Sequence, residues 1–172
     1  MENYHEKGLV FLTDLTNFGR ETKNMNLDQI AELLAHFAET THKIVKSGGG
    51  QVIDYMYDSA LGYFPADCAD KGVRTLMEMK RQIEEWLKAD GYKMKLRTAA
   101  HYGEFMVLYM PPFTTPEIIG NTVNIAVRLG SGGQSSHRGR LILSAQAFRK
   151  LTPETRKSFH KFTEPIVYLA EE

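Results

Sequence analysis

Short apolar runs alternate with longer amphipathic stretches along the chain. The first run, at residues 8–12, carries the β-formers Val10 and Phe11 and predicts a buried strand. After a polar loop, the pattern predicts a helix that begins near Asn26, where Gln29 three residues later completes a capping-box pattern. One helical stripe is expected to pack inward. Its members are Ile30, Leu33, Leu34, Phe37, Thr41, Ile44 and Val45.

The Gly-rich segment 48–50 ends this helix, since glycine is the usual residue just beyond a helix C-terminus. Two strand-like runs follow, at 51–56 and 60–64. Three residues, 57–59, separate them, so the pattern predicts a hairpin with Asp58 at its tip.

The rest of the chain alternates further helices and strands, and we find no internal repeat or linker in it. We expect a helix over 67–88 and then one or two strands within 93–110, with a bend or turn at Gly103. A short helix over 122–129 and a flexible polar loop over 131–140 are expected next. The last predicted elements are a strand at 141–143, a helix over 145–151 capped by Ser144, and a strand at 166–169. This order predicts one α+β domain over residues 1–172, with a core at about 8–169 and a mostly antiparallel sheet covered by helices.

The amino-acid composition argues against several classes of protein. The chain has 21 Lys and Arg against 21 Asp and Glu, and a zero net charge argues against a nucleic-acid partner or a polybasic membrane arm. Its single cysteine, Cys68, excludes a disulfide framework and a cysteine-rich zinc site. No apolar stretch is long enough to span a bilayer, and the first residues do not resemble a signal peptide. We therefore expect a cytoplasmic protein with no membrane partner.

Two acidic residues stand at the ends of predicted strands. Asp14 ends the first strand and Asp58 occupies the hairpin tip. If the sheet brings these ends together, the two carboxylates form a site for Mg²⁺, which prefers oxygen ligands. The alternative is that both are ordinary loop and turn residues, because Asp favours turns.

A second pair of polar residues lies in the helix expected over 122–129. Asn124 and Arg128 are four residues apart and therefore share one helix face. An amide and a guanidinium on one exposed face suit an anionic phosphate ligand. The alternative is a solvated polar face with no ligand.

Five segments carry distinctive residues in a fixed order. They are 10–18 (VFLTDLTNF), 49–60 (GGQVIDYMYDSA), 101–104 (HYGE), 120–129 (GNTVNIAVRL) and the C-terminal pair 140–144 and 162–168. In these segments the chain resembles the catalytic domains of class III nucleotidyl cyclases. The resemblance implies a ferredoxin-like α+β domain that forms a homodimer, with active sites shared between the two copies.

The resemblance also implies roles for individual residues. Asp14 and Asp58 of one copy would bind two Mg²⁺ or Mn²⁺ ions, and the opening motif would place Thr16, Asn17 and Phe18 at the nucleotide. Asn124 would orient the ribose, Arg128 of the other copy would neutralise charge at the reacting phosphate, and Lys161 is the nearest candidate for a lysine that holds the triphosphate.

The chain departs from the family pattern at three points. Tyr57 stands where a Gly is usual, and a positive φ there would strain the turn and could displace Asp58. The Gly usually found after the lysine is missing behind Lys161, which leaves a surface role open for that residue. The two positions that select the base are Asp54 and Glu117, which match neither the adenylate nor the guanylate pattern.

These residues lead to one hypothesis and its alternatives. The hypothesis is a nucleotidyl cyclase that converts a nucleoside triphosphate to its 3′,5′-cyclic monophosphate and pyrophosphate. ATP is favoured because adenylate cyclases are the commoner members. The alternatives are a guanylate cyclase or another base specificity, and a cyclase-like domain that binds nucleotide or dimerises without turnover. Since the sequence shows no sensor domain, we expect regulation to come from an unidentified partner, an ion or gene dosage.

Overall fold

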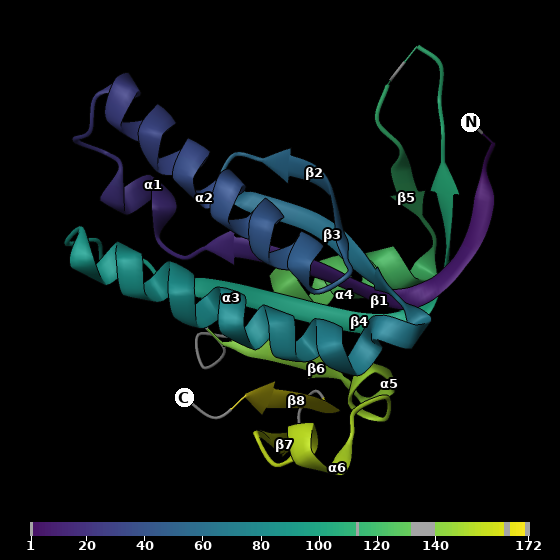
Figure 1. Cartoon of the computed structure of the whole chain (residues 1–172). Helices are drawn as coiled ribbons and strands as arrows, with labels where there is room; N and C mark the ends of the chain where they lie inside the picture. Colours follow the sequence, from purple (N-terminus) through teal and green to yellow (C-terminus); the bar gives the residue numbers. More distant parts are fainter. Residues whose placement is uncertain (1, 113, 132–139, 164–165, 171–172) are drawn as a thin grey trace.

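The computed structural model describes residues 2–112, 114–131, 140–163 and 166–170, which form an α+β fold around an eight-stranded, mostly antiparallel sheet (Figure 1). The strands are β1 (Tyr4–Leu15), β2 (Gln51–Met56), β3 (Ser59–Pro65), β4 (Leu96–Leu108), β5 (Glu117–Ile119), β6 (Leu141–Ser144), β7 (Phe159–Thr163) and β8 (Ile166–Ala170). Their order is β2-β3-β1-β4-β6-β8-β7, and β5 pairs with β4. In this part of the chain only β4 and β6 pair in parallel.

Helices cover both faces of this sheet. They are α1 (Phe18–Glu21), α2 (Leu27–Ser47), α3 (Ala69–Ala89), α4 (Asn121–Ser131), α5 (Ala145–Phe148) and α6 (Pro153–Arg156), with a 3₁₀ turn at Ala66–Cys68. The long helices α2 and α3 lie side by side across one face, and α4 packs against β1 and β4 (Figure 1). Although α2 and α3 each run for 21 residues, no helix in the described ranges is apolar over a length that could cross a membrane.

The central strand β1 sends alternate side chains to opposite faces of the sheet. Leu9 and Phe11 join the core beneath α2 and α3, whereas Val10 and Leu12 join a second cluster with Val123 of α4. The uninterrupted apolar run in the sequence therefore reflects a strand that is buried on both faces.

The start of α2 follows the sequence prediction in detail. The Asn26 side chain accepts a hydrogen bond of 2.9 Å from the Gln29 backbone N–H, and the Gln29 side chain accepts one of 3.0 Å from the Asn26 N–H. Of the predicted stripe, Leu33, Phe37 and Thr41 are buried, as are the two residues 44–45. The capping box and the apolar spacing thus suffice to place this helix.

Several expectations need correction. Gly103 is neither a bend nor a turn, because β4 runs through it as one strand. A Cβ there would lie 2.4 Å from the Thr122 Oγ1, so the glycine lets α4 approach the sheet. The predicted helix over 145–151 ends at Phe148. The pattern missed the short elements α1, β5, α6 and β7. The polar loop expected over 131–140 lies, at 132–139, outside the described residues.

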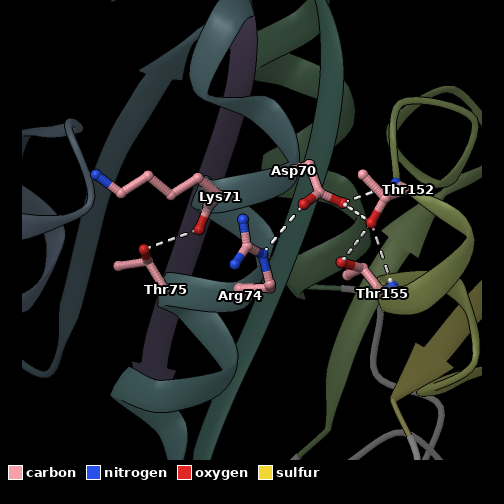
Figure 2. Close-up of polar contacts among 6 residues, drawn as sticks. All are labelled: Asp70, Lys71, Arg74, Thr75, Thr152 and Thr155. Atoms are coloured by element: carbon pink, nitrogen blue, oxygen red, sulfur yellow. Dashed lines mark hydrogen bonds and ion pairs between the residues drawn. The ribbon is translucent and has the colours of Figure 1, made fainter.

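One carboxylate joins the long helix α3 to the C-terminal part of the fold (Figure 2). Asp70 Oδ1 accepts hydrogen bonds from the backbone N–H of Thr152 at 2.8 Å and from its hydroxyl at 3.1 Å. Thr152 in turn caps α6 by accepting from the Thr155 N–H. Burial opposes ionisation of Asp70, but these hydrogen bonds, one from Thr155 and the charge of Arg74 hold its pKa below the ordinary 3.8.

We expect Asp70→Ala to lower the free energy of unfolding by about 1–2 kcal/mol at neutral pH, because Thr152 loses a charged acceptor. The depressed pKa means that this stabilisation is present above about pH 4 and is lost as the pH falls through the folded-state pKa. Denaturant unfolding at pH 7 and in acid measures both effects. The control is Arg74→Ala, since Arg74 also contacts Asp70 but its side chain is 61% exposed, and a change below about 0.5 kcal/mol is expected. Equal losses in the two variants would contradict the assignment.

Candidate active site

The C-terminal end of β1, the tip of the β2–β3 hairpin and the start of β4 surround a cleft of about 730 Å³. Both candidate metal ligands line it, as do the three residues of the opening motif and several residues that sequence analysis did not single out. The polar and loop residues among them are Asp14, Thr16, Asn17, Phe18, Arg20, Asp58, Ser59, Arg97 and Ser131.

Sheet pairing explains why the two aspartates meet here. In the antiparallel register of β1 with β3, Asp14 lies opposite Ser59, the neighbour of Asp58. The Leu15 N–H donates a 3.0 Å hydrogen bond to the Asp58 carbonyl, which fixes the turn to the end of β1. Two carboxylates that are 44 positions apart in the sequence therefore face the same cleft.

Arg97 is one residue of this cleft that sequence analysis missed. In the register of β1 with β4 it lies opposite Asp14. Its Nη2 and Nε both donate to Asp14 Oδ2, at 2.7 and 3.0 Å. Only the strand register reveals this partner, because Asp14 and Arg97 are 83 residues apart. Arg97 thus compensates one of the two negative charges at the end of β1.

The pKa values of both carboxylates are raised, but the groups that act on them differ. Burial raises the pKa of Asp14, which is 9% exposed, while the hydrogen bonds and charge of Arg97 oppose that rise. Burial also raises the pKa of Asp58; its own backbone N–H and Arg97 lower it, and the neighbouring Asp14 charge raises it further. Ionisation of each carboxylate therefore costs free energy, and a bound cation would offset that cost.

The hairpin turn adopts the strained backbone that the sequence suggested. Tyr57 has φ of 55°, in the left-handed region that favours glycine. Its side chain is 80% exposed and therefore meets no steric obstacle. With this turn, Asp58 lines the same cleft as Asp14.

The loop after β1 has a second left-handed residue. Asn17 has φ of 59°, a conformation that Asn tolerates better than most residues. Next to it, Thr16 exchanges two hydrogen bonds with Lys95: the Thr16 N–H donates to the Lys95 carbonyl at 2.8 Å, and the Lys95 N–H donates to the Thr16 hydroxyl at 3.0 Å. These contacts fix the path of the loop along the cleft.

The remaining candidates lie elsewhere. Asn124 and Arg128 are exposed on α4, whose Val127 and Ser131 border the cleft, but neither of the two lines it. Lys161 is exposed on β7, the last strand on the opposite side of the sheet from β2. Within one chain, the cleft therefore gathers the carboxylates and the opening motif but leaves these three residues outside.

The two candidate base-selecting residues lie on strands that contact each other. Asp54 is on β2 and Glu117 is on β5, both half-buried, and these strands are in contact. Neither residue lines the cleft that contains Asp14. The candidate base-selecting residues thus lie outside the carboxylate cleft, on two strands that contact each other.

Comparison with known proteins gives a consistent fold but little sequence similarity. No protein-family model matches the chain, and no curated protein matches its sequence significantly. Among solved structures, the adenylyl cyclase CyaB from P. aeruginosa superimposes with a TM-score of 0.82 at 18% identity, over 100% of this chain and 97% of that one.

Guanylyl cyclases superimpose equally well. The monomeric guanylyl cyclase domain of the RhoGC fusion protein from the aquatic fungus Blastocladiella emersonii gives a TM-score of 0.81 at 18% identity, over 99% of this chain and 98% of that one. The guanylate cyclase domain of RhGC from Catenaria anguillulae, in complex with GTP, gives 0.81 at 19% identity with the same coverage. The chain therefore has the fold of cyclase catalytic domains, as its motifs predicted.

We expect Tyr57→Gly to raise the free energy of unfolding by up to about 1 kcal/mol, because glycine adopts a positive φ without steric cost. The matched control is Met56→Gly, one residue earlier in the extended strand β2, where glycine is expected to destabilise by about 0.5–1 kcal/mol. Thermal and denaturant unfolding of the two variants checks the difference. A loss of stability in both would show that the turn carries no strain.

Proposed function

We propose that this chain, which has the fold of adenylyl and guanylyl cyclase catalytic domains, is a nucleotidyl cyclase. The reaction converts a nucleoside triphosphate to the 3′,5′-cyclic monophosphate and pyrophosphate. The observation that carries the proposal is the meeting of Asp14 and Asp58 in one cleft at the end of β1. A cleft with two carboxylates suits a metal-assisted phosphoryl reaction better than a purely structural role.

The carboxylates fit a divalent cation. Mg²⁺ is commonly bound by one or two carboxylates together with substrate phosphates, so it does not need a complete protein cage. Since the described residues contain no group of three or more His, Cys, Asp or Glu side chains placed for a metal, substrate phosphates would have to complete the coordination. Asp14 and Asp58 would hold two Mg²⁺ or Mn²⁺ ions, which when bound would acidify the ribose 3′-hydroxyl and balance the charge of the triphosphate.

The protein's own residues would orient the nucleotide around these carboxylates. The loop with Thr16, Asn17 and Phe18 lies along the cleft and would contact the phosphates. Arg97 would keep Asp14 ionised and correctly oriented through its two hydrogen bonds. In this arrangement the nucleophile and the phosphate chain are aligned before reaction, which lowers the entropic part of the barrier.

A second copy of the chain would complete the site. Asn124 and Arg128 lie outside the cleft of their own chain and are exposed, so they are available to a partner's nucleotide. There Asn124 would orient the ribose, Arg128 would neutralise charge at the reacting phosphate, and Lys161 would hold the triphosphate. The exposed Met56 at the cleft and Tyr57 beside it are apolar surface that such a homodimer would cover.

Asp54 and Glu117 leave the base to be determined by experiment. Ionised Glu117 can accept from the amino group of adenine, and ionised Asp54 can accept from the N–H groups of guanine. We place ATP first among the substrates because adenylate cyclases are the commoner members of the family that the motifs resemble. The regulator of the reaction is a further open part of the proposal, and an ion or a protein partner would fill that role.

The second candidate function is nucleotide binding without turnover. The Arg97 pair favours it, because Arg97 already compensates the charge of Asp14 that a metal ion would otherwise balance. A nucleotide that binds only the folded protein raises its melting temperature whether or not it reacts. The two candidates therefore separate when binding and product are measured on the same sample.

We expect purified protein with Mn²⁺ to form a cyclic monophosphate from at least one of ATP, GTP, CTP and UTP, with ATP the first to be tested. Chromatography of the products and a thermal shift with each triphosphate are the measurements. An inactive control is Asp58→Ala. A thermal shift without product from any triphosphate supports the second candidate. If no triphosphate gives either a thermal shift or a product, both candidates are refuted.

Asp58→Ala and Arg128→Ala should each reduce turnover at least about 100-fold, as expected when an electrostatic group of a reaction site is removed. A mixture of the two variants should recover activity, because a mixed dimer contains one undamaged site. With complete exchange and random pairing, recovery should approach roughly a quarter of the wild-type rate. Exchange is checked by native mass spectrometry of differently tagged copies. If exchange occurs and no activity returns, each site lies within one chain.

A further inference from the structure

The cleft contains a second arginine with a different environment from Arg97. Arg20 lies on α1, is exposed and lines the cleft. No salt bridge or side-chain hydrogen bond of Arg20 occurs among the described residues. Arg97, in contrast, is committed to Asp14 at 2.7 Å. Among the described residues, Arg20 is thus a cation of this cleft that is available to a ligand.

Hydrogen bonds anchor the short element α1, which carries Arg20. The Glu21 side chain accepts a 3.1 Å hydrogen bond from the Lys93 N–H, so the acidic neighbour of Arg20 is engaged elsewhere. The Thr22 hydroxyl donates to the Phe18 carbonyl at 2.9 Å and closes the turn. Upstream, the paired hydrogen bonds between Thr16 and Lys95 tie the loop to the entry of β4. Arg20 is therefore presented from an anchored turn.

Arg20 lines the cleft from α1, whereas Asp14 lines it from β1 and Asp58 from the β2–β3 turn. If the reacting phosphate lies at Asp14 and Asp58, the outer phosphates of the chain extend away from the carboxylates. A planar guanidinium that lines the cleft from another element, α1, is suited to bind them through two parallel hydrogen bonds.

We propose that Arg20 binds the outer phosphates of the triphosphate, those that leave as pyrophosphate, from the same chain that supplies Asp14 and Asp58. The inference rests on the proposed function for the identity of the ligand. Arg20 would supply a cation within the cleft itself, whereas Lys161 lies on β7 at the edge of the sheet. Each chain would then provide its own contact to the leaving group in addition to any contact from a partner.

The experiment compares Arg20→Gln and Arg20→Lys with the control Lys23→Gln, an exposed cation three residues away that does not line the cleft. Affinities for pyrophosphate and for adenosine 5′-monophosphate are measured by calorimetry at fixed Mn²⁺, and KM is measured for the best triphosphate. Arg20→Gln should weaken pyrophosphate binding roughly 10-fold or more, the loss expected for one charge-assisted hydrogen bond. Monophosphate binding should not change. Arg20→Lys should recover part of the loss, and Lys23→Gln should match the wild type.

The outcomes separate this inference from the proposed function. Equal pyrophosphate affinities in Arg20→Gln and Lys23→Gln would overturn the role of Arg20, even if the enzyme is active. A parallel loss of monophosphate binding would also overturn it, because the effect would then not be confined to the outer phosphates. If the wild type binds no pyrophosphate, the inference fails. If pyrophosphate binding depends on Arg20 but no triphosphate is cyclised, only the proposed reaction fails.

Discussion

The pairing of β1 with β4 is the constraint on which the rest of the structure depends. These two long strands run antiparallel through the middle of the sheet, and every other strand is added on one side or the other. Their register places Asp14 opposite Arg97 at one end. A shift of one residue would turn each side chain to the other face, away from its partners in the two cores. The same pattern of apolar residues that forms the core thus fixes the geometry of the cleft.

This arrangement places charged groups at the boundary of a well-packed interior. Asp14 lies directly after residues that are completely buried, and Asp58 lies in a turn that includes a left-handed tyrosine. Neither feature favours stability by itself, because buried carboxylates and positive φ angles both cost free energy. Natural proteins retain such local costs mainly where they serve a ligand or a reaction. The two features occur together at the only place where the opening motif, the hairpin and β4 converge within the described residues.

Local patterns in the sequence were sufficient for the long elements and for the motifs. Asn26 and Gln29 identify the start of α2, and the run around Phe11 identifies β1. The short strand β5 and the turn α1 were missed because three or four residues carry no usable periodicity. Arg97 was missed for another reason: its importance depends on a partner far away in the sequence, and only the register of two strands brings them together.

The distance between those partners has a consequence for how the molecule forms. Asp14 and Arg97 are separated by 83 residues, a stretch that includes both long helices and the whole hairpin. Contacts between distant parts of a chain form late, because the loop between them must first be closed. A growing polypeptide on the ribosome cannot make this contact until β4 has emerged. The ion pair at the cleft therefore marks the pairing of β1 with β4: a chain that stalls or is truncated before β4 keeps its aspartates but lacks the strand that joins Arg97 to Asp14.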